Sequence, residues 1–446
     1  MQKIIEAVDK HRQLILDAER FIWKHPETGY KETVTSAYLA EEFEKLGYDL
    51  VKAEDITGFY TVIDTGKPGP EILILGELDS VICPTHPEAD PKTGAVHACG
   101  HNAQCAALLG IAAALKEPEM LDGLYGRIRL CAVPSEELLE IDFRSKLKEK
   151  GVIKYFGGKT EFLHRGYFDG VDIAFMVHAD ERFGLSSVGN VGCLTKHIIY
   201  KGTAAHAGAS PWNGNNALYA ANCGLNAVNA IRETFKESDV IRVHPIITHG
   251  GDIVNAIPRT VALESYVRGS SFEAIKDANK KVNRALIGAA LSINTNIEII
   301  DTPGYTPLYN SSHMVQLAED AFEKLSPGKD FVIYSSIESG STDMGDLSAI
   351  MPAVHCYAGG TEGECHGSDY QITDPHAACI TSAKWQLIML KMLLENNAVR
   401  ANNIIEEFQP RFASKEDLLS YIDAFNDSGD RIQYNEDGTA SVRIDK

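Results

Sequence analysis

Short apolar runs alternate with helical segments over the first 190 residues, and this alternation limits the fold more than any other feature. Residues 102–116 predict a helix, and strands are predicted at "FYTVIDTG", "EILILGELD", "RIRLCAVPSEE" and "VDIAFMVHAD". Apolar runs of this length between helices are typical of strands buried on both faces of a sheet. The sequence therefore predicts an α/β fold.

The pattern changes between Val191 and about Asp301. Strands and helices are predicted in the order β-α-β-β-α-β at "LTKHIIYKG", residues 215–235, "VIRVHPIITHGG", "TVALESYVRG", "SFEAIKDANKKVNRALIGAAL" and "NIEIID". This order is that of a ferredoxin-like split βαβ unit. We expect residues 191–301 to form a domain inserted into a catalytic domain made of residues 1–190 and 302–400.

Two further segments are less regular. After the inserted unit, "PAVHCYAGG" predicts a strand and residues 376 to about 397 a long helix, and residues 401–446 predict a small helical extension with a polar tail. The charges of residues 138–170 indicate a solvated helix followed by a loop over the site. That segment is interpreted either as scaffold or as a lid that faces substrate.

The charge balance excludes one class of partner. Lys and Arg number 42 against 62 Asp and Glu, a formal net charge of −20. Nucleic acid is not expected as a partner, because phosphate binding needs a basic face. No membrane partner is expected either, since no segment has the apolar length of a span and the first residues read as an amphipathic helix, with Ile4, Val8, Ile15, Ala18 and Ile22 at helical spacing.

Nine cysteines are scattered along the chain without a Cys-x-x-Cys pair. An odd count without a disulfide framework predicts reduced thiols and a cytoplasmic protein. Most of these cysteines are expected to be small core residues, and Cys105, Cys131, Cys356 and Cys365 are interpreted in that way.

The stretch "VHACGHNAQCAALLG" places Cys99 and His101 just before an apolar helix. Thiolate and imidazole are metal-ligand types, and Gly100 lets the backbone turn tightly between them. A structural turn with ordinary polar residues is the alternative. His97 stays without an assigned role.

Other candidate ligands follow the carboxyl ends of predicted strands. Asp79, the pair Glu136 and Glu137, and His178 occupy such positions, and open α/β sheets bind ligands at that edge. His366 adds an imidazole from a distant segment. Metal-dependent hydrolysis needs ligands, a water and a base, and this set offers each component.

Each of these residues alone is weak support, because a lone histidine is more often structural. We keep the structural interpretation for His86, His97, His164, His197, His244, His249 and His313. The metal-site prediction depends on the candidates falling together at strand ends.

The order of the short motifs resembles that of the metal-dependent aminoacylase and carboxypeptidase clan, in its amidohydrolase branch of aminobenzoyl-glutamate, hippurate and auxin-conjugate hydrolases. The resemblance covers about residues 1–400 and rests on "WKHPETGYKE", "GELDS", "HACGHN", "PSEE", "VHAD", "GTAAHAGASP", "GGDIVNAIP", "STDMGD" and "CHGSDY". It implies a metallopeptidase-type catalytic domain with a mixed sheet and an inserted ferredoxin-like lid and dimerisation domain.

The resemblance also implies roles for the candidates. Cys99 matches the bridging ligand of a site for two divalent ions, and His101, Glu137, His178 and His366 match the terminal ligands. Glu136 matches the general base and acid. Asp79 matches a carboxylate that orients the site, although a plain strand-end acid is an equal interpretation. The mixed ligands suit zinc or manganese.

Residues of the inserted unit are implied as well. His206 resembles a histidine that donates a hydrogen bond to the oxyanion, and such a residue can reach a partner subunit's site, which implies a homodimer. Asn255 and Arg268 resemble groups that hold the substrate's backbone or carboxylate, and a surface salt bridge is the alternative for Arg268.

One motif departs from the branch. Much of the branch reads Cys-Gly-His-Asp-x-His, whereas this chain has Asn102 and Gln104 in "CGHNAQ". Aminobenzoyl-glutamate-type members also carry Asn there, and "STDMGD" points the same way. The departure removes no proposed ligand and bears on substrate identity.

The leading hypothesis is a metal-dependent amidohydrolase that cleaves small-molecule N-acyl or N-aroyl amino acids, or dipeptides, with Glu136 as the base. A second hypothesis is a non-catalytic, metal-dependent binder of amino-acid conjugates, against which the intact "PSEE" pair counts. A third is thiol catalysis by Cys99 with His97 or His101.

Overall fold

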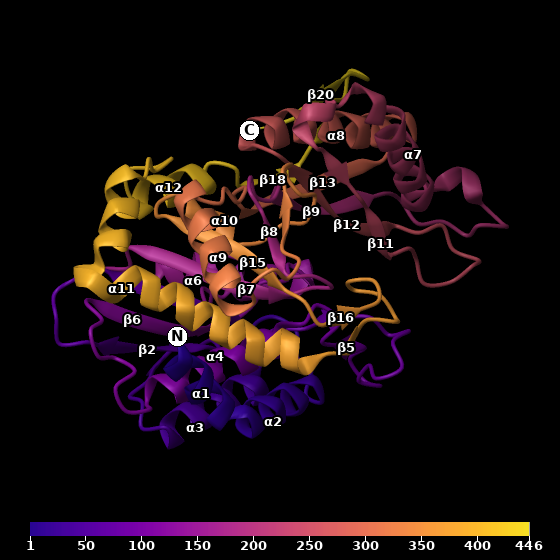
Figure 1. The fold of residues 1–446 in the computed structure, drawn as a ribbon. Helices are drawn as coiled ribbons and strands as arrows, with labels where there is room; N and C mark the ends of the chain where they lie inside the picture. Colours follow the sequence, from indigo (N-terminus) through magenta and orange to yellow (C-terminus); the bar gives the residue numbers. More distant parts are fainter. Residues whose placement is uncertain (446) are drawn as a thin grey trace.

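The computed structural model describes residues 1–445, which build two main β-sheets with separate hydrophobic cores (Figure 1). The strands of the larger sheet are β1 (Val51–Lys52), β2 (Phe59–Asp64), β3 (Glu71–Glu77), β6 (Arg127–Val133), β7 (Ile173–Ala179), β8 (Gly184–Ser186), β14 (Val332–Tyr334) and β15 (Ala353–Ala358). Their order is β1-β2-β6-β3-β7-β15-β8-β14. The central strands β6, β3, β7 and β15 are parallel, whereas β2 and β8 join antiparallel, so the sheet is mixed as predicted.

Both faces of this sheet are covered, as the apolar runs predicted. Every residue of β3 is buried: Ile72 and Ile74 face one cluster, and Leu73 and Leu75 face another. The first face packs on α1 (Gln2–Lys10), α2 (Arg12–Trp23), α3 (Thr33–Lys45), α4 (His101–Leu115), α9 (Ser312–Leu325) and α11 (Ser382–Glu407). The second face packs on α6 (Gly158–His164), α10 (Met344–Ser348) and α12 (Lys415–Asp423).

The second sheet has the predicted strand and helix order. It contains β9 (Gly192–Lys201), β10 (Arg242–Val243), β11 (Ile246–His249), β12 (Thr260–Gly269), β13 (Asn296–Tyr305) and β18 (Asp427–Asp430). The order is β10-β12-β9-β13-β18, all antiparallel, with β11 also paired to β12. Helices α7 (Ala217–Ala230) and α8 (Phe272–Ser292) pack on it, which is the arrangement of a split βαβ unit. The domain boundaries given above stay a prediction.

Several elements differ from the sequence prediction. The helix expected over residues 215–235 ends at Ala230. The strand expected at "VIRVHPIITHGG" is divided into β10 and β11 around Pro245, because proline offers no backbone N–H to the ladder. The N-terminal helix breaks at His11 into α1 and α2, yet all five of its predicted apolar positions are buried.

Residues 138–170 were predicted to form a solvated helix followed by a loop over the site, but much of this segment is buried and has a structural role. Helix α5 (Ile141–Glu149) is partly exposed, but residues 158–163 of α6 are buried. The charged side chains of Arg144 and Lys159 are buried. Arg144 donates to the carbonyls of Leu139 and Phe156 in the same segment, whereas Lys159 pairs with Glu77 and Asp343 from other segments.

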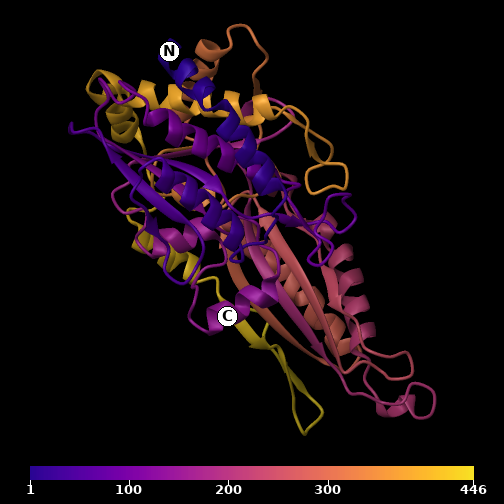
Figure 2. The same cartoon turned by 90° about the horizontal axis from the view of Figure 1, so that it is seen from below.

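The C-terminal extension is more than a polar tail. After α12, strand β18 pairs with β13 at one edge of the second sheet. A hairpin of β19 (Ile432–Tyr434) and β20 (Ala440–Val442) follows and projects from the body in Figure 2. The extension therefore adds a short edge strand beside β13, which would otherwise be the edge of the second sheet.

One helical stretch, residues 376–407, is long and apolar enough by composition to cross a membrane, contrary to the expectation that no segment has that length. In the structure 83% of its most apolar window is buried. It begins with a π-helical turn at His376–Thr381 and continues as α11 against α4 and α9. Its hydrophobicity is thus accounted for by the protein core.

Candidate metal centre

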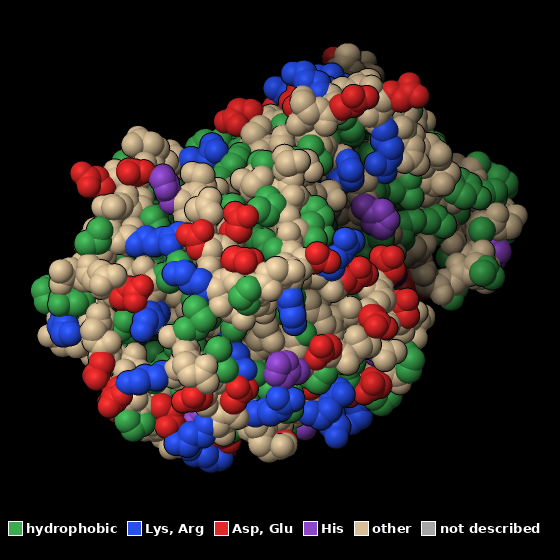
Figure 3. Space-filling model, viewed as in Figure 1, with side chains coloured by type: hydrophobic (Ala, Val, Ile, Leu, Met, Phe, Trp, Pro, Cys, Tyr) green, Lys and Arg blue, Asp and Glu red, His purple; other side chains and the backbone are tan. Residues whose placement is uncertain are grey.

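A cavity of about 410 Å³ opens at the carboxyl ends of β6, β7 and β15, where the sequence predicted the site. Its lining includes Cys99, Glu136, Glu137, His178, Cys365 and His366. On the face shown in Figure 3, acidic side chains gather beside the hollow between the two parts of the molecule. Five of these six lining residues were predicted site residues.

The turn that carries Cys99 and His101 depends on Gly100. Its φ of +82° is in the left-handed region, and a Cβ there would lie 2.5 Å from the Tyr370 hydroxyl oxygen and 2.7 Å from the Ala179 Cβ. Only glycine fits this position without a shift of its neighbours. Gly100 thereby lets the chain place a thiol and an imidazole on the two sides of one tight turn.

Two histidines have the same tautomer, and the backbone sets it. Nδ1 of His101 donates to the carbonyl of Asp79 at 2.9 Å, and Nδ1 of His178 donates to the carbonyl of Ala179 at 2.7 Å. A carbonyl can only accept, so Nδ1 of each ring carries a proton, and in the neutral ring that binds metal Nε2 has the free lone pair. This arrangement is how proteins orient metal-binding histidines.

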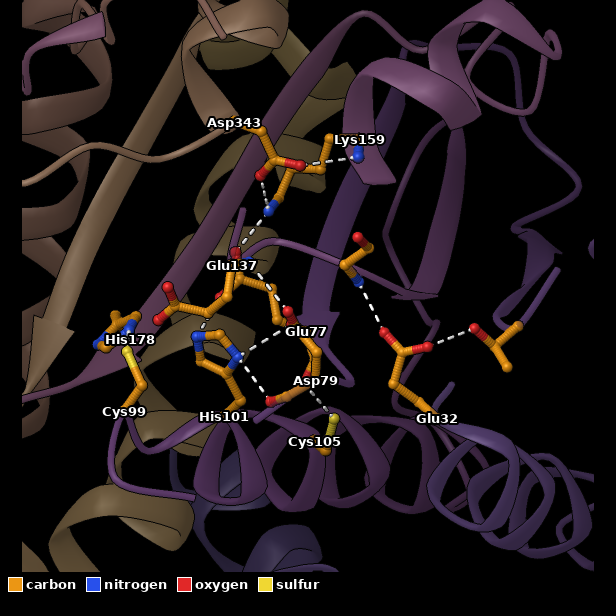
Figure 4. Close-up of polar contacts among 12 residues, drawn as sticks. Glu32, Glu77, Asp79, Cys99, His101, Cys105, Glu137, Lys159, His178 and Asp343 are labelled. Carbon is orange, nitrogen blue, oxygen red and sulfur yellow. Dashed lines mark hydrogen bonds and ion pairs between the residues drawn. The ribbon is translucent and has the colours of Figure 1, made fainter. Parts of the chain in front are cut away.

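Both free nitrogens point into the donor cluster (Figure 4). Nε2 of His178 lies 3.4 Å from Sγ of Cys99, and Nε2 of His101 is buried without a hydrogen-bond partner, 3.3 Å from Oε2 of Glu77. A buried nitrogen without a partner is costly unless a ligand satisfies it. The donors thus fit a bound metal ion.

Asp79 supports two of the predicted ligands. Besides its carbonyl contact, Oδ1 lies 3.2 Å from Nδ1 of His101, and Oδ2 accepts the backbone N–H of Glu137 at 2.9 Å. Its side chain is fully buried. Of the two interpretations, the geometry favours a carboxylate that orients the site.

All five predicted ligands fall into compact groups of donor atoms. Atoms within 4.8 Å of one another occur in three sets at the cavity: Cys99 with His101 and His178; His101 with Glu136 and Glu137; and Cys99 with Cys365 and His366. The sets share Cys99 and His101. Sulfur, imidazole and carboxylate donors in such proximity suit divalent transition metals.

The neighbouring carboxyl groups of Glu136 and Glu137 have opposite pKa shifts. Burial, together with Glu77, Glu137 and Asp343, raises the pKa of Glu136 well above its usual range. Burial would also raise the pKa of Glu137, but His366, whose Nε2 is 2.8 Å away, holds it well below the usual range. Glu137 is thereby kept as an anion that can bind a metal ion, whereas Glu136 can hold a proton.

A buried lysine lies behind the base, and no pattern in the sequence indicated it. Lys159 on α6 forms ion pairs with Glu77 and Asp343, and all three side chains are buried. Burial would raise the pKa of Glu77, but Lys159 and His101 lower it to about 2. Glu77, Glu136 and Asp343 form one further acidic set, so Lys159 supplies the positive charge that it needs.

The loop that presents Glu136 is held by a second residue that was not predicted. Ser135 has a φ of +58°, unusual for a residue other than glycine, and its N–H donates to Oε1 of Glu32 at 2.8 Å. Glu32 comes from the "WKHPETGYKE" segment and is fully buried. That motif therefore acts on the site through the loop after β6.

The candidates of the second sheet divide into two groups. Arg268 on β12 lines the cavity. His206 and Asn255 do not: both are exposed on loops where the N–H of Ala207 donates to the Asn255 carbonyl at 2.9 Å. Within one chain the structure therefore brings Arg268, but neither His206 nor Asn255, to the metal donors.

One cysteine prediction was wrong. Cys105, Cys131 and Cys356 are buried core residues as predicted, but Cys365 is exposed at the cavity with Sγ 3.9 Å from Sγ of Cys99. Its position beside His366 in "CHGSDY" was the available signal. His97 is buried, and neither of its ring nitrogens has a partner.

Residues 73–386, more than half of the chain, match the model of peptidase family M20/M25/M40. The chain belongs to this family. The resemblance inferred from the motifs is thereby confirmed, as is the prediction of an enzyme of the metal-dependent amide-hydrolysing class.

Two M20 relatives align over most of this chain. The Xaa-Arg dipeptidase of Mus musculus is 28% identical over 375 residues, 83% of this chain and 82% of the relative. The N-acetyl-L-cysteine deacetylase of Bacillus subtilis is 26% identical over 400 residues, 86% of this chain and 89% of the relative. A p-aminobenzoyl-glutamate hydrolase polypeptide of Escherichia coli is 27% identical over 66% of this chain and 59% of its own length.

Solved structures share the M20 fold. The Bacillus subtilis YXEP protein, described as a dinuclear metal-binding peptidase from the M20 family, superposes with a TM-score of 0.61 at 19% identity, covering 86% of this chain and 99% of its own. The aminobenzoyl-glutamate utilization protein of Klebsiella pneumoniae gives 0.64 at 18% identity, covering 88% and 98%. These likenesses confirm the fold class.

Proposed function

We propose that this M20 enzyme hydrolyses the amide bond of N-acyl or N-aroyl amino acids, such as aminobenzoyl-glutamate, or of dipeptides, with two divalent ions of zinc or manganese. The observation that carries the proposal is the pair Glu136 and Glu137 at the cavity, with the second carboxylate turned to the donors and the first surrounded by acids. The names of the relatives support the substrate class.

The donor geometry supports the ligand set that the motif resemblance implies. Cys99 belongs to two of the donor sets and is proposed as the bridge, with His101, Glu137, His178 and His366 as terminal ligands. When bound, the ions would polarise the amide carbonyl and lower the pKa of a water molecule. The protein's side chains would transfer the proton and bind the substrate.

Glu136 is proposed as the proton carrier. Its carboxylate takes the proton from the attacking water and delivers it to the amine as the C–N bond breaks. The acids Glu77 and Asp343 near it keep the protonated form accessible, and Lys159 prevents the cluster from becoming too negative. Asp79 holds His101 and the Glu137 backbone in place.

Arg268 is proposed to bind a substrate carboxylate. It lines the cavity together with the donors, and its guanidinium stacks on Tyr266 at 5.2 Å from the ring centroid. A planar guanidinium can bind a carboxylate through two parallel hydrogen bonds. This feature suits the free carboxylate of an amino acid or dipeptide.

A specific observation favours dipeptides with a basic side chain as a second candidate substrate. Beyond the proposed ligands and base, the residues that line the cavity include three acids, Asp180, Glu181 and Glu364. Such a wall attracts a cationic side chain and repels an anionic one. It therefore favours a substrate of the Xaa-Arg type over aminobenzoyl-glutamate.

The second sheet is proposed as a lid and dimerisation domain that spans about residues 191–301. Its β11 edge, the neighbouring loops and the first turn of α7 expose large apolar side chains, at Trp212, Tyr219, Ile246, Ile253 and Val254. An exposed apolar patch beside an open strand edge is typical of an interface. In a homodimer, His206 and Asn255 would enter the partner's site, where His206 donates to the oxyanion and Asn255 holds the substrate.

A cytoplasmic location is proposed from the cysteines. All nine are free, and seven of them are buried. Free thiols in this number are typical of a reducing compartment.

The test is amine release by the purified protein from N-acyl amino acids, aminobenzoyl-glutamate and dipeptides with acidic, neutral and basic residues. Each reaction is run with zinc or manganese and again with a chelator. Chelator-sensitive release is expected, with the basic dipeptides cleaved faster than the acidic ones. Metal binding without release from any substrate would instead support the non-catalytic binder, and release that survives the chelator would support thiol catalysis.

A further inference from the structure

Cys365 lies at the mouth of the cavity, in the loop between β16 (Thr361–Glu362) and β17 (Gln371–Ile372). It precedes the proposed ligand His366, and its side chain is exposed. One donor atom from each of Cys99, Cys365 and His366 lies within 4.8 Å of the other two. Two thiols and an imidazole thus converge on one point.

The distance between the two sulfur atoms matches a shared ion. Tetrahedral zinc with Zn–S bonds of about 2.3 Å separates two sulfur ligands by about 3.8 Å. Sγ of Cys99 and Sγ of Cys365 are 3.9 Å apart. A disulfide would bring them to about 2.05 Å, so this spacing is not that of a bonded pair.

The same comparison holds on the other side of Cys99. A thiolate and an imidazole on one tetrahedral zinc are about 3.5 Å apart. The observed separation between Sγ of Cys99 and Nε2 of His178 is 3.4 Å. Cys99 therefore lies at ligand spacing from His178 and from Cys365 at once.

We propose that Cys365 is a further metal ligand, which with Cys99 and His366 gives one of the two ions a second thiolate. This inference rests on the proposed metal centre. Thiolate ligands select zinc and other soft ions over manganese. The proposed ligand set thus favours zinc over manganese at this position.

Cobalt substitution tests the proposal, because each cobalt–sulfur bond contributes to a charge-transfer band in the near ultraviolet. Metal-free wild type, Cys365→Ser and Cys223→Ser are titrated with cobalt. With two ions bound, a bridging Cys99 makes two cobalt–sulfur bonds and Cys365 makes one. Cys365→Ser is therefore expected to lose about a third of the band. Cys223 lies on helix α7, which packs on the second sheet, and Cys223→Ser is the matched control that should keep the full band.

The outcomes separate this inference from the function on which it rests. An undiminished band in Cys365→Ser would overturn the assignment of Cys365 while leaving the metal centre intact. If wild type binds no cobalt, the metal centre itself fails. Equal thermal midpoints for Cys365→Ser and wild type without metal would confirm that the exposed substitution leaves the fold unchanged.

A second measurement needs neither cobalt nor substrate. Iodoacetamide labels free thiols, and mass spectrometry follows each cysteine with and without zinc. Zinc is expected to slow the labelling of Cys365 at least about tenfold, because a coordinated thiolate is a poor nucleophile, while the rate at Cys223 is unchanged. Equal labelling rates at Cys365 with and without zinc would contradict the proposal.

Discussion

Glu136 and Glu137 are adjacent in the chain, yet their carboxyl groups face opposite electrical surroundings. Glu137 is 2.8 Å from Nε2 of His366, and Glu136 belongs to a set with the acids Glu77 and Asp343. The turn at Ser135, held by Glu32, sets this division. One backbone turn therefore gives two identical side chains different chemistry.

Replacing Glu136 should separate binding from turnover. Glu136→Gln removes the proton carrier without removing a proposed ligand, so the variant should keep its metal and lose about 10²- to 10⁴-fold in kcat. Glu137→Gln, the matched change one position on, should lose metal. Metal content by mass spectrometry and kcat with the best substrate check both. A Glu136→Gln variant with wild-type kcat would eliminate this residue as the base.

Removing Lys159 should weaken the fold and the metal centre together. Lys159→Met leaves Glu77 and Asp343 buried without a counter-charge, which costs about 3–5 kcal/mol in the free energy of unfolding. Metal affinity should also fall, because Glu77 lies 3.3 Å from Nε2 of His101.

The chain offers a matched control for this variant. Lys196 in the second sheet is equally buried and pairs with Asp301. Lys196→Met should cost similar stability in urea titrations but leave metal affinity unchanged. If Lys159→Met binds metal as tightly as wild type, then Lys159 has a purely structural role.

Asp346 should give the fold a recognisable pH dependence. Burial raises its pKa from 3.8 to about 6, so the folded state holds a proton that the unfolded state releases. The contribution to stability is fully present below about pH 4 and is lost as the pH rises through about 6. Relative to wild type, Asp346→Asn should therefore gain up to about 3 kcal/mol between pH 4 and pH 7. Urea unfolding at both pH values measures this difference, and a pH-independent difference would contradict it.

Mixing two inactive variants should restore activity if His206 serves the partner's site. His206→Ala and Glu136→Gln are each expected to be inactive as homodimers. After subunit exchange, half of the dimers are mixed and each has one complete site, so about a quarter of wild-type activity should return. No recovery, with exchange verified by native mass spectrometry, would mean that His206 does not act across the interface.

Several candidate site residues could be located from the sequence because they follow a strand whose apolar pattern is clear. Asp79 follows β3, Glu136 and Glu137 follow β6, and His178 lies near the end of β7. Parallel strands bring such ends to one edge of a sheet. The predicted strands therefore located these candidate site residues.

The site residues that were not predicted depend on contacts between segments that are far apart in the sequence. Lys159 lies in a charged segment that a sequence pattern assigns to solvent, and it is buried only because Glu77 and Asp343 arrive from distant positions. Cys365 lies in a loop with no periodicity, so its approach to Cys99 depends wholly on the tertiary fold. Local composition and spacing therefore did not indicate the ion pairs of Lys159, and only the position beside His366 pointed to Cys365.

Strand β18 gives the second sheet two unlike edges. It covers β13, while β10 and β11 on the other side leave their outer backbone groups without a strand partner among the described residues. A sheet open at both sides could add copies in either direction and grow into a fibre. Strand β18 is a short, acidic edge, because only Asp427–Asp430 pair with β13, and short charged edge strands resist further pairing. If copies of the chain join through the β11 edge, cutting the chain before Asp427 should expose the longer edge of β13 and let assembly continue beyond a pair.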